Sequence, residues 1–337
     1  MIQGLYTVAE VAAMIKKGDP LLLAGDTALL SQLPKGKWIA GATSRFVENG
    51  KTLVTTREKI FVHNLTGIAT EVKLKAYDAT TLHNIYDDAF NNGFSVLIVP
   101  FMSDVLSEYG ANCSNYSNFA GRAVCGWVAV GPIYSEYERD DVSLVFSGES
   151  GMSYDNTGMV MHIALPEGKY AEVHAISPFK PDDGDTIVFE ENGQHVENVL
   201  VNGVRQNFRQ YLIDKQIDRS NKAHNVLVGD HDTGIIMNVT IFEETENDLK
   251  KYVTIGAPVY KGVPYRFSKV DTESSYDSTK PSDGDIVFSL SCITNYVRPD
   301  VFLKYLPVIN GPFAYGEIAY FLLNHATVYV TVGNLSN

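Results

Sequence analysis

Apolar residues in this chain of 337 residues are gathered in short runs, each closed by glycine, proline or small polar residues. Examples are "PLLLAG" at 20–25, "KWIAGATS" at 37–44 and "SVLIVPF" at 95–101. Runs of this length between turn residues indicate buried strands rather than long helices. The segments "DTALLSQL" at 26–33 and "SDVLSEYG" at 103–110 read as short helices between such strands. The alternation of strand, helix and strand predicts an α+β fold.

This order occurs twice, and the second occurrence shares residues with the first. Residues 26–31 resemble residues 104–107, and a tryptophan stands in the strand that follows each helix, Trp38 in one case and Trp127 in the other. Shared order together with shared residues favours an internal duplication. The alternative is two unrelated units that each use tryptophan to fill a core.

Capping residues indicate two further helices. Thr7 and Glu10 form a capping box in front of "VAAMIKK", and "TTLHNIYDDAFNNG" at 80–93 has the start and stop signals of a second helix. We expect two related parts built of mixed and antiparallel sheets flanked by helices. The first part spans residues 1–200 and contains the duplication, and the second spans residues 201–337.

Composition excludes several classes of protein. The chain is 45% hydrophobic and carries a formal net charge of -13, which repels nucleic-acid phosphates. No apolar run reaches the roughly 20 residues of a membrane span, and the amino terminus lacks the pattern of a signal peptide. The cysteines Cys113, Cys125 and Cys292 form no CxxC pair, which fits a reducing cytoplasm. We therefore expect a cytoplasmic protein without a nucleic-acid or membrane partner.

Sequence signatures of common cofactors are missing. The chain has neither GxxxxGK[ST] nor a GxGxxG between a strand and a helix, so nucleotide binding by a standard loop is disfavoured. His231 stands between two aspartates in "GDHDTG", but no second histidine at ligand spacing accompanies it. A polar turn is the better interpretation, and we expect neither a metal nor a cofactor.

Two residues near the end of the chain carry the open functional question. Cys292 ends the expected strand "DIVFSLSC"; as a nucleophile it would need a nearby base or cation, and otherwise it is a small buried thiol. Glu317 lies among aromatic and aliphatic residues in "GPFAYGEIAYFLL". Its carboxylate could accept hydrogen bonds from loop amides, hold the ammonium group of a ligand, or face water. The sequence leaves these alternatives open.

The carboxy-terminal segments resemble the FIST family, the F-box and intracellular signal transduction sensory domain. The residues that carry the resemblance are Ser291-Cys292, Arg298, the stretch 311–318 and the stretch 324–327. The hairpin and helix in "TIVFEENGQHVENVLVNGVRQNFRQYL" and the stretch "WIAGATSRFVENGKTLV" also look like parts of that family. Arg298 follows Cys292 only after several residues, whereas the commoner family pattern has Gly-Arg directly after the cysteine.

The resemblance implies a cytoplasmic sensor of small molecules, with an amino acid or a related metabolite as its ligand. We expect a free-standing binding protein without catalytic turnover, which signals through a separately encoded partner or simply binds its ligand. A cysteine-dependent enzyme that uses Cys292 is one alternative, and a scaffold for protein partners is another.

We place the ligand pocket where "SLSC", "NYVR" and "NGPFAYGEI" meet. Strand ends and glycine-flanked loops bring backbone amides and side chains close to a small ligand. Glu317 would be the acid of this pocket, and Phe313 or Tyr315 an apolar wall. The expected ligand-binding residues are Cys292, Arg298, Asn310, Phe313, Tyr315, Gly316 and Glu317.

Overall fold

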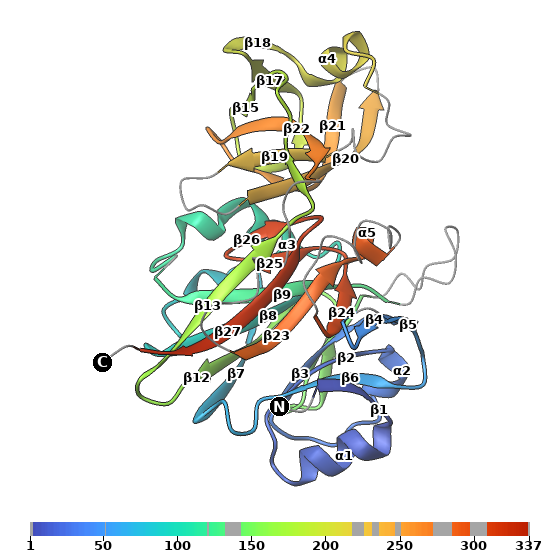
Figure 1. Cartoon of the computed structure of the whole chain (residues 1–337), viewed down its shortest axis with the longest axis vertical. Coiled ribbons are helices and arrows are strands. Elements are labelled where there is room, and N and C mark those ends of the chain that lie inside the picture. Colours follow the sequence, from blue (N-terminus) through green and yellow to red (C-terminus); the bar gives the residue numbers. More distant parts are fainter. Residues whose placement is uncertain are drawn as a thin grey trace.

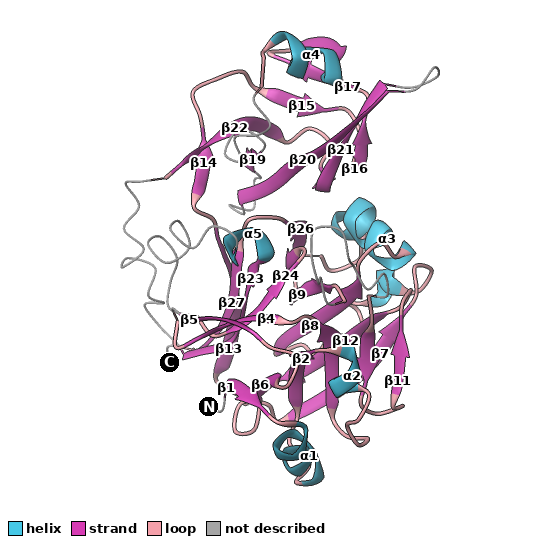
Figure 2. Cartoon of the chain, turned by 90° about the vertical axis from the view of Figure 1, so that its right-hand side faces the viewer, coloured by secondary structure: helices cyan, strands magenta, loops and turns pink. Residues whose placement is uncertain are grey.

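The structure is a computed structural model, and it describes residues 3–50, 52–119, 121–131, 143–217, 226–230, 236–246, 251–271, 285–296 and 309–335. Strands dominate the described residues and the helices are short, so the predicted α+β class is confirmed. Figures 1 and 2 show the strands gathered in a larger body, with a smaller unit at one end of the long axis. None of the described helices is long and apolar enough to cross a membrane.

The body is built from three repeats of six strands. The first repeat contains β1 (Gln3–Tyr6), α1 (Val8–Lys16), β2 (Leu21–Gly25), α2 (Thr27–Leu30), β3 (Trp38–Ala42), β4 (Arg45–Glu48), β5 (Thr52–Thr55) and β6 (Ile60–Asn64). The second contains β7 (Glu71–Tyr77), the 3-10 helix η1 (Leu82–Asn84), β8 (Gly93–Pro100), α3 (Asp104–Asn112), η2 (Cys113–Asn115), β9 (Ala123–Ala129), β10 (Val145–Ser147), β11 (Met152–Tyr154) and β12 (Gly158–Ala164). The third contains β13 (Lys169–Ile176), β23 (Asp285–Cys292), α5 (Ile293–Tyr296), β24 (Gly311–Ala314), β25 (Glu317–Ala319), β26 (Phe321–Leu323) and β27 (Thr327–Asn334).

The three six-stranded sheets have the same strand arrangement. Their orders are β1-β6-β2-β3-β10-β11, then β7-β12-β8-β9-β25-β26, then β13-β27-β23-β24-β4-β5. In each sheet the two strands joined through a helix are parallel, namely β2 with β3, β8 with β9 and β23 with β24, and the other pairs are antiparallel. Three units therefore share one strand order, whereas the sequence indicated only two.

Each repeat also contributes a hairpin to the sheet of another repeat. The hairpin β4–β5 of the first repeat joins the third sheet, β10–β11 of the second joins the first, and β25–β26 of the third joins the second. The exchange closes a ring, because each repeat completes its sheet with a hairpin from one of the other two. The predicted boundary at residue 200 does not match this arrangement, because strands from both sides of it share the second and third sheets.

Aromatic side chains from all three sheets fill the space between them. The indole of Trp127 stacks on the ring of Phe288 with centroids 5.9 Å apart, and the ring of His63 lies between Phe61 and Phe288 at 5.0 and 4.9 Å. Gly41 makes room for this contact, since a Cβ atom there would lie 2.7 Å from Trp127 Nε1. The sheets pack directly against one another through this shared core.

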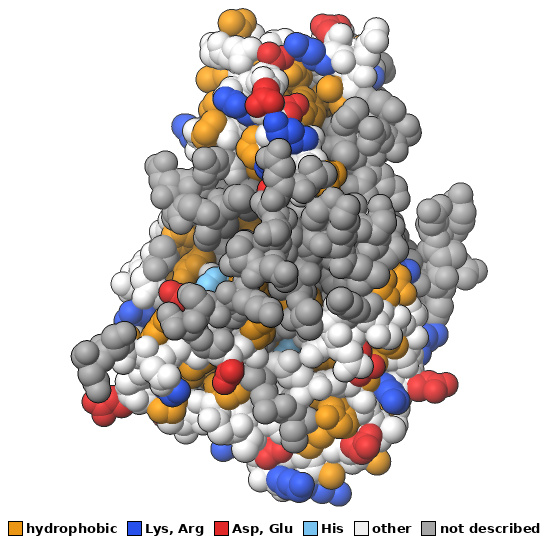
Figure 3. Space-filling view, viewed as in Figure 1, with side chains coloured by type: hydrophobic (Ala, Val, Ile, Leu, Met, Phe, Trp, Pro, Cys, Tyr) orange, Lys and Arg blue, Asp and Glu red, His pale blue; other side chains and the backbone are white. Residues whose placement is uncertain are grey.

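The smaller unit is an insertion between β13 and β23. Its nine strands form one sheet, made of β14 (Phe179–Pro181), β15 (Ile187–Phe189), β16 (Gly193–Val196), β17 (Asn198–Val201), β18 (Val204–Asn207), β19 (Val226–Asp230), β20 (Ile236–Glu246), β21 (Lys251–Val259) and β22 (Pro264–Val270). The helix α4 (Phe208–Asp214) packs on it. Residue 200 lies inside β17, within this unit. Figure 3 shows acidic and basic side chains interspersed on its visible surface.

The inserted unit contacts the body through side chains of both. The rings of Tyr260 and Phe321 have centroids 4.9 Å apart, and the Tyr260 hydroxyl lies 3.7 Å from the Cys113 sulfur. Thr240 Oγ1 lies 2.6 Å from His325 Nε2. These contacts fix the insertion above the β25–β26 hairpin.

Candidate functional site

The three parallel strand pairs end close together, and hydrogen bonds join their ends. The Val130 amide, just after β9, donates to the Ala42 carbonyl at the end of β3 over 3.1 Å. The Thr43 hydroxyl, just after β3, donates to the Phe313 carbonyl in β24 over 2.9 Å. The ends of β3, β9 and β24, one from each repeat, therefore meet at one place.

The third side of this junction is formed between the second and third repeats. The Tyr315 amide donates to the Val128 carbonyl over 3.4 Å, and the Val128 amide donates to the Gly316 carbonyl over 2.9 Å. Ligands of open α/β sheets commonly bind beyond the carboxyl ends of parallel strands. Here the carboxyl ends of three such strands converge.

A narrow pocket lies at this junction, and we call it the strand-end pocket. Its volume is about 10 Å³, which is room for one water-sized group. It therefore admits one small group of a ligand rather than a whole molecule. Its lining residues come from all three repeats and are Thr43, Ser44, Arg45, Val130, Gly131, Ile293 and Tyr315.

Arg45 is the charged residue of the strand-end pocket. Its guanidinium carbon lies 5.1 Å from the centroid of the Tyr296 ring, and the Tyr296 hydroxyl is 2.7 Å from Thr55 Oγ1. This stacking orients the guanidinium group. Among the residues that the structure describes, no carboxylate forms an ion pair with Arg45. Arg45 is thus a lining residue whose charge is held against Tyr296 and is not neutralised by any described carboxylate.

The two hydroxyl residues of the pocket differ in their availability. Thr43 Oγ1 is engaged by the Phe313 carbonyl. Ser44 is also buried, and within the described parts of the chain its hydroxyl makes no hydrogen bond. Val130, Ile293 and Tyr315 supply apolar surface beside these polar groups. The pocket combines one cation, one free hydroxyl and an apolar wall.

Cys292 lies apart from this lining, in the interior at the end of β23. It is 1% exposed, and its sulfur accepts a hydrogen bond from the Thr294 hydroxyl at 3.1 Å. Burial, followed by the nearby Glu317 carboxyl group, raises the pKa of the Cys292 thiol well above its usual value. A thiol in this setting stays protonated and is a poor nucleophile.

Glu317 is the buried partner of Cys292. Its side chain is 0% exposed, and its Oε2 atom accepts a hydrogen bond from the Ala326 amide at 3.2 Å. Burial raises the pKa of Glu317 well above its usual value, and the hydrogen bonds from Ala326 and Cys292 only partly oppose this effect. Burial thus favours the neutral form of the carboxyl group, which braces the turn before β27 by accepting the Ala326 amide. Its Oε1 atom has no hydrogen-bond partner among the described residues.

The other residues expected in the ligand pocket are spread over different surroundings. Tyr315 lines the strand-end pocket, whereas the neighbouring Gly316 packs against Val128 and Leu322. Phe313 is not among the lining residues, and its ring meets that of Tyr296 at 5.2 Å. Asn310 Oδ1 accepts a hydrogen bond from the Gly50 amide. Arg298 lies outside the described residues.

The predicted convergence of "SLSC", "NYVR" and "NGPFAYGEI" is thus found only in part. Phe313 lies in β24 of the third sheet and Glu317 in β25 of the second sheet, so the two side chains are separated. The residues that sequence reasoning missed are Thr43, Ser44, Arg45, Val130, Gly131 and Ile293. The small residues at the exit of "KWIAGATS" were the available signal, because they mark the end of a buried strand.

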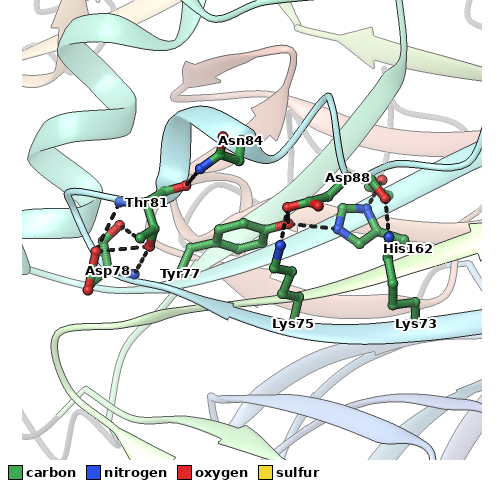
Figure 4. Close-up of polar contacts among 9 residues, drawn as sticks. Lys73, Lys75, Tyr77, Asp78, Thr81, Asn84, Asp88 and His162 are labelled. Atoms are coloured by element: carbon green, nitrogen blue, oxygen red, sulfur yellow. Dashed lines mark hydrogen bonds and ion pairs between the residues drawn. The ribbon is translucent and has the colours of Figure 1, made fainter.

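A second buried polar cluster lies across the second sheet (Figure 4). The Tyr77 hydroxyl donates to Asp88 Oδ2 over 2.9 Å and lies 3.0 Å from His162 Nε2, and His162 Nδ1 lies 2.8 Å from Ser95 Oγ. Lys75 pairs with the same Asp88 carboxylate. Burial lowers the pKa of His162 to about 4. Because these groups form hydrogen bonds and an ion pair with one another, we interpret the cluster as a structural network.

Among the described residues, no group of three or more His, Cys, Asp or Glu side chains is placed to hold a metal ion. His231 of "GDHDTG" lies outside the described residues.

Comparison with known proteins gives a family but no activity. No curated protein matches the chain. One family, described as a family of unknown function (DUF6976), matches residues 6–333 and so spans all three repeats and the insertion. The chain belongs to this family, DUF6976.

Proposed function

We propose that the protein is a small-molecule-binding protein whose ligand docks at the strand-end pocket. The observation that carries the proposal is the meeting of three equivalent strand ends around Arg45 and Ser44, whose side chains have no ion-pair or hydrogen-bond partner among the described residues. A structural role alone does not require an arginine without an acidic partner at such a junction.

The surroundings of Cys292 support a binding protein over a cysteine-dependent enzyme. The thiol is buried and its pKa is raised, and His325, whose backbone contacts the thiol, lies with its ring Nε2 at hydrogen-bond distance from Thr240. A nucleophilic cysteine needs a lowered pKa and access to substrate. Cys292 therefore serves packing in our proposal.

The wider setting of the proposal follows from the sequence. The three cysteines are free and buried, which fits a cytoplasmic location. The resemblance to FIST domains supports a sensory role, an amino acid or related metabolite as ligand, and a separately encoded signalling partner.

A thermal-shift screen against a metabolite library tests the binding function. We expect at least one compound to raise the melting temperature of the wild-type protein, because a ligand that binds only the folded state stabilises it. Val130→Trp fills the pocket and should abolish that shift. Val204→Trp is the matched control, since Val204 is 66% exposed on the inserted unit. A shift that survives Val130→Trp would place the ligand elsewhere, and no shift at all would favour the scaffold alternative.

A further inference from the structure

The ligand group that enters the strand-end pocket can be inferred from the chemistry of its lining, and this inference rests on the proposed function. Arg45 is the single charged residue among the lining residues. We propose that the pocket selects a carboxylate group, which Arg45 and Ser44 hold together. The rest of the ligand then lies against the apolar wall of Val130, Ile293 and Tyr315.

The charge of the pocket favours a monoanion. One guanidinium group balances one negative charge, and it presents a planar fork that matches a carboxylate. A phosphate group carries up to two negative charges and usually needs several donors or a helix amino terminus. The net charge of -13 further disfavours polyanions. A single carboxylate is therefore the best match for Arg45.

Preorganisation supports the same assignment. Stacking on Tyr296 at 5.1 Å limits the motion of the Arg45 side chain, and Thr55 in turn fixes the Tyr296 hydroxyl. Part of the entropy cost of ordering the arginine is thus met before the ligand arrives. Ser44, buried and with its hydroxyl unengaged among the described residues, can donate to the second carboxylate oxygen.

The size of the pocket sets what enters it. With about 10 Å³ available, the pocket admits one carboxylate oxygen, while the second oxygen and the remainder of the ligand stay at its mouth. A small apolar substituent on the acid can contact Val130 and Ile293 there. The inferred ligand class is a small monocarboxylate with an apolar substituent.

Matched acids and amides test the inference. The probes are 3-methylbutanoate and phenylacetate, their primary amides, and inorganic phosphate, each titrated into the full chain by calorimetry. We expect both acids to bind, the amides to bind at least about tenfold more weakly, and phosphate not to compete. Equal binding of acid and amide, no binding of either acid, or preferential binding of phosphate would overturn the inference.

Variants of Arg45 give a second readout. Arg45→Met should weaken binding of the acids at least about tenfold, and Arg45→Lys should retain part of the affinity because the charge remains. Arg205→Met is the control, since Arg205 pairs with Glu190 on the inserted unit. Undiminished acid binding by a folded Arg45→Met protein would contradict the inference. A neutral library compound blocked by Val130→Trp would leave the proposed function standing while this inference fails.

Discussion

At the scale of single residues, Glu317 and the buried histidines show how the fold keeps titratable groups neutral. Glu317 is fully buried with one oxygen lacking a partner among the described residues, and His63 is buried between aromatic rings. An uncompensated buried charge costs far more than a neutral polar group. Both residues therefore resist ionisation, although they act on stability in opposite pH ranges.

Replacing Glu317 by Gln should stabilise the protein at neutral and alkaline pH. The folded-state pKa of Glu317 is raised above the usual value of 4.5, so above pH 4.5 the unfolded chain ionises first and stability falls. The loss is about 1.4 kcal/mol per pH unit until the folded pKa is reached. Below pH 4.5 this effect is absent. Urea unfolding at pH 4 and pH 8 should give equal stabilities at pH 4 and a more stable variant at pH 8.

The contrary result for Glu317 is a difference between variant and wild type that does not change with pH. That result would mean that Glu317 ionises normally in the folded protein. Charged Glu317 would then be available to hold a ligand ammonium group, as one sequence hypothesis held.

The buried histidines His63 and His162 should make the folded protein less stable as the pH falls. Burial lowers the folded-state pKa of His63 to about 3 and that of His162 to about 4, from 6.5. Between pH 6.5 and these values the unfolded chain takes up protons that the folded protein does not, so their contribution to stability is lost as the pH falls. Imidazole nitrogen shifts measured by NMR at pH 5 should show both rings neutral. Protonated rings in the folded protein at pH 5 would refute the assignment.

At the scale of elements, local signals predicted the parallel units well. The N-caps Thr7, Asp26 and Ser103 begin α1, α2 and α3, and the apolar runs at 20–25 and 95–101 contain β2 and β8. Caps and short buried strands depend on nearby residues, which a sequence displays directly.

The predicted helix at 80–93 is wrong apart from the 3-10 turn η1. Asp78 accepts the amides of Thr80 and Thr81, which starts the turn. Farther on, Asp88 is drawn to Lys75 and Tyr77 of β7, and this tertiary contact replaces a continuing helix. Capping signals in a sequence do not reveal a tertiary contact that competes with the helix.

The alignment of Trp38 with Trp127 matched equivalent strands of the first two repeats, but the two residues stand at different positions along those strands. Trp38 lies opposite Leu21 at the start of β2, whereas Trp127 lies opposite Ile98 near the end of β8. The two indoles therefore occupy different cores. The duplication is expressed in strand order more than in residue identity.

Gly41 in β3 offers a test of how the first two sheets pack. A Cβ atom there would lie 2.7 Å from both Ile98 Cγ2 and Trp127 Nε1, so Gly41→Ala should cost about 1–3 kcal/mol of stability. Trp127→Phe removes the crowding indole nitrogen, and the double variant should recover part of the loss. Denaturant unfolding of the four proteins in this double-mutant cycle measures the coupling. Additive effects would mean that Gly41 and Trp127 do not crowd each other.

At the scale of the whole molecule, ring-like exchange of hairpins and one insertion define the architecture. The sequence could not show that β4 pairs with β24 or β9 with β25, because these pairings join distant segments. The same exchange assembles the strand-end pocket, and so only Tyr315 among the expected pocket residues lines it. Residues from the other two repeats were beyond the reach of local patterns.

Fragments should reveal this organisation. Residues 178–271 contain every strand of the inserted sheet and should unfold in one cooperative transition. Residues 1–200 end inside β17 and lack β24 and β25, so we expect no cooperative unfolding from them. Circular dichroism during thermal unfolding of both fragments makes the comparison. A cooperative transition in the 1–200 fragment would show that the exchanged hairpins are dispensable.

The proposed ligand docks at the junction of the three repeats. A crystal structure of the full chain soaked with phenylacetate tests this directly. We predict electron density for the acid with its carboxylate beside Arg45 and Ser44 and its ring against Val130 and Ile293. Density beside Cys292 and Glu317 instead, or an empty strand-end pocket with the acid bound elsewhere, would contradict docking at the strand-end pocket.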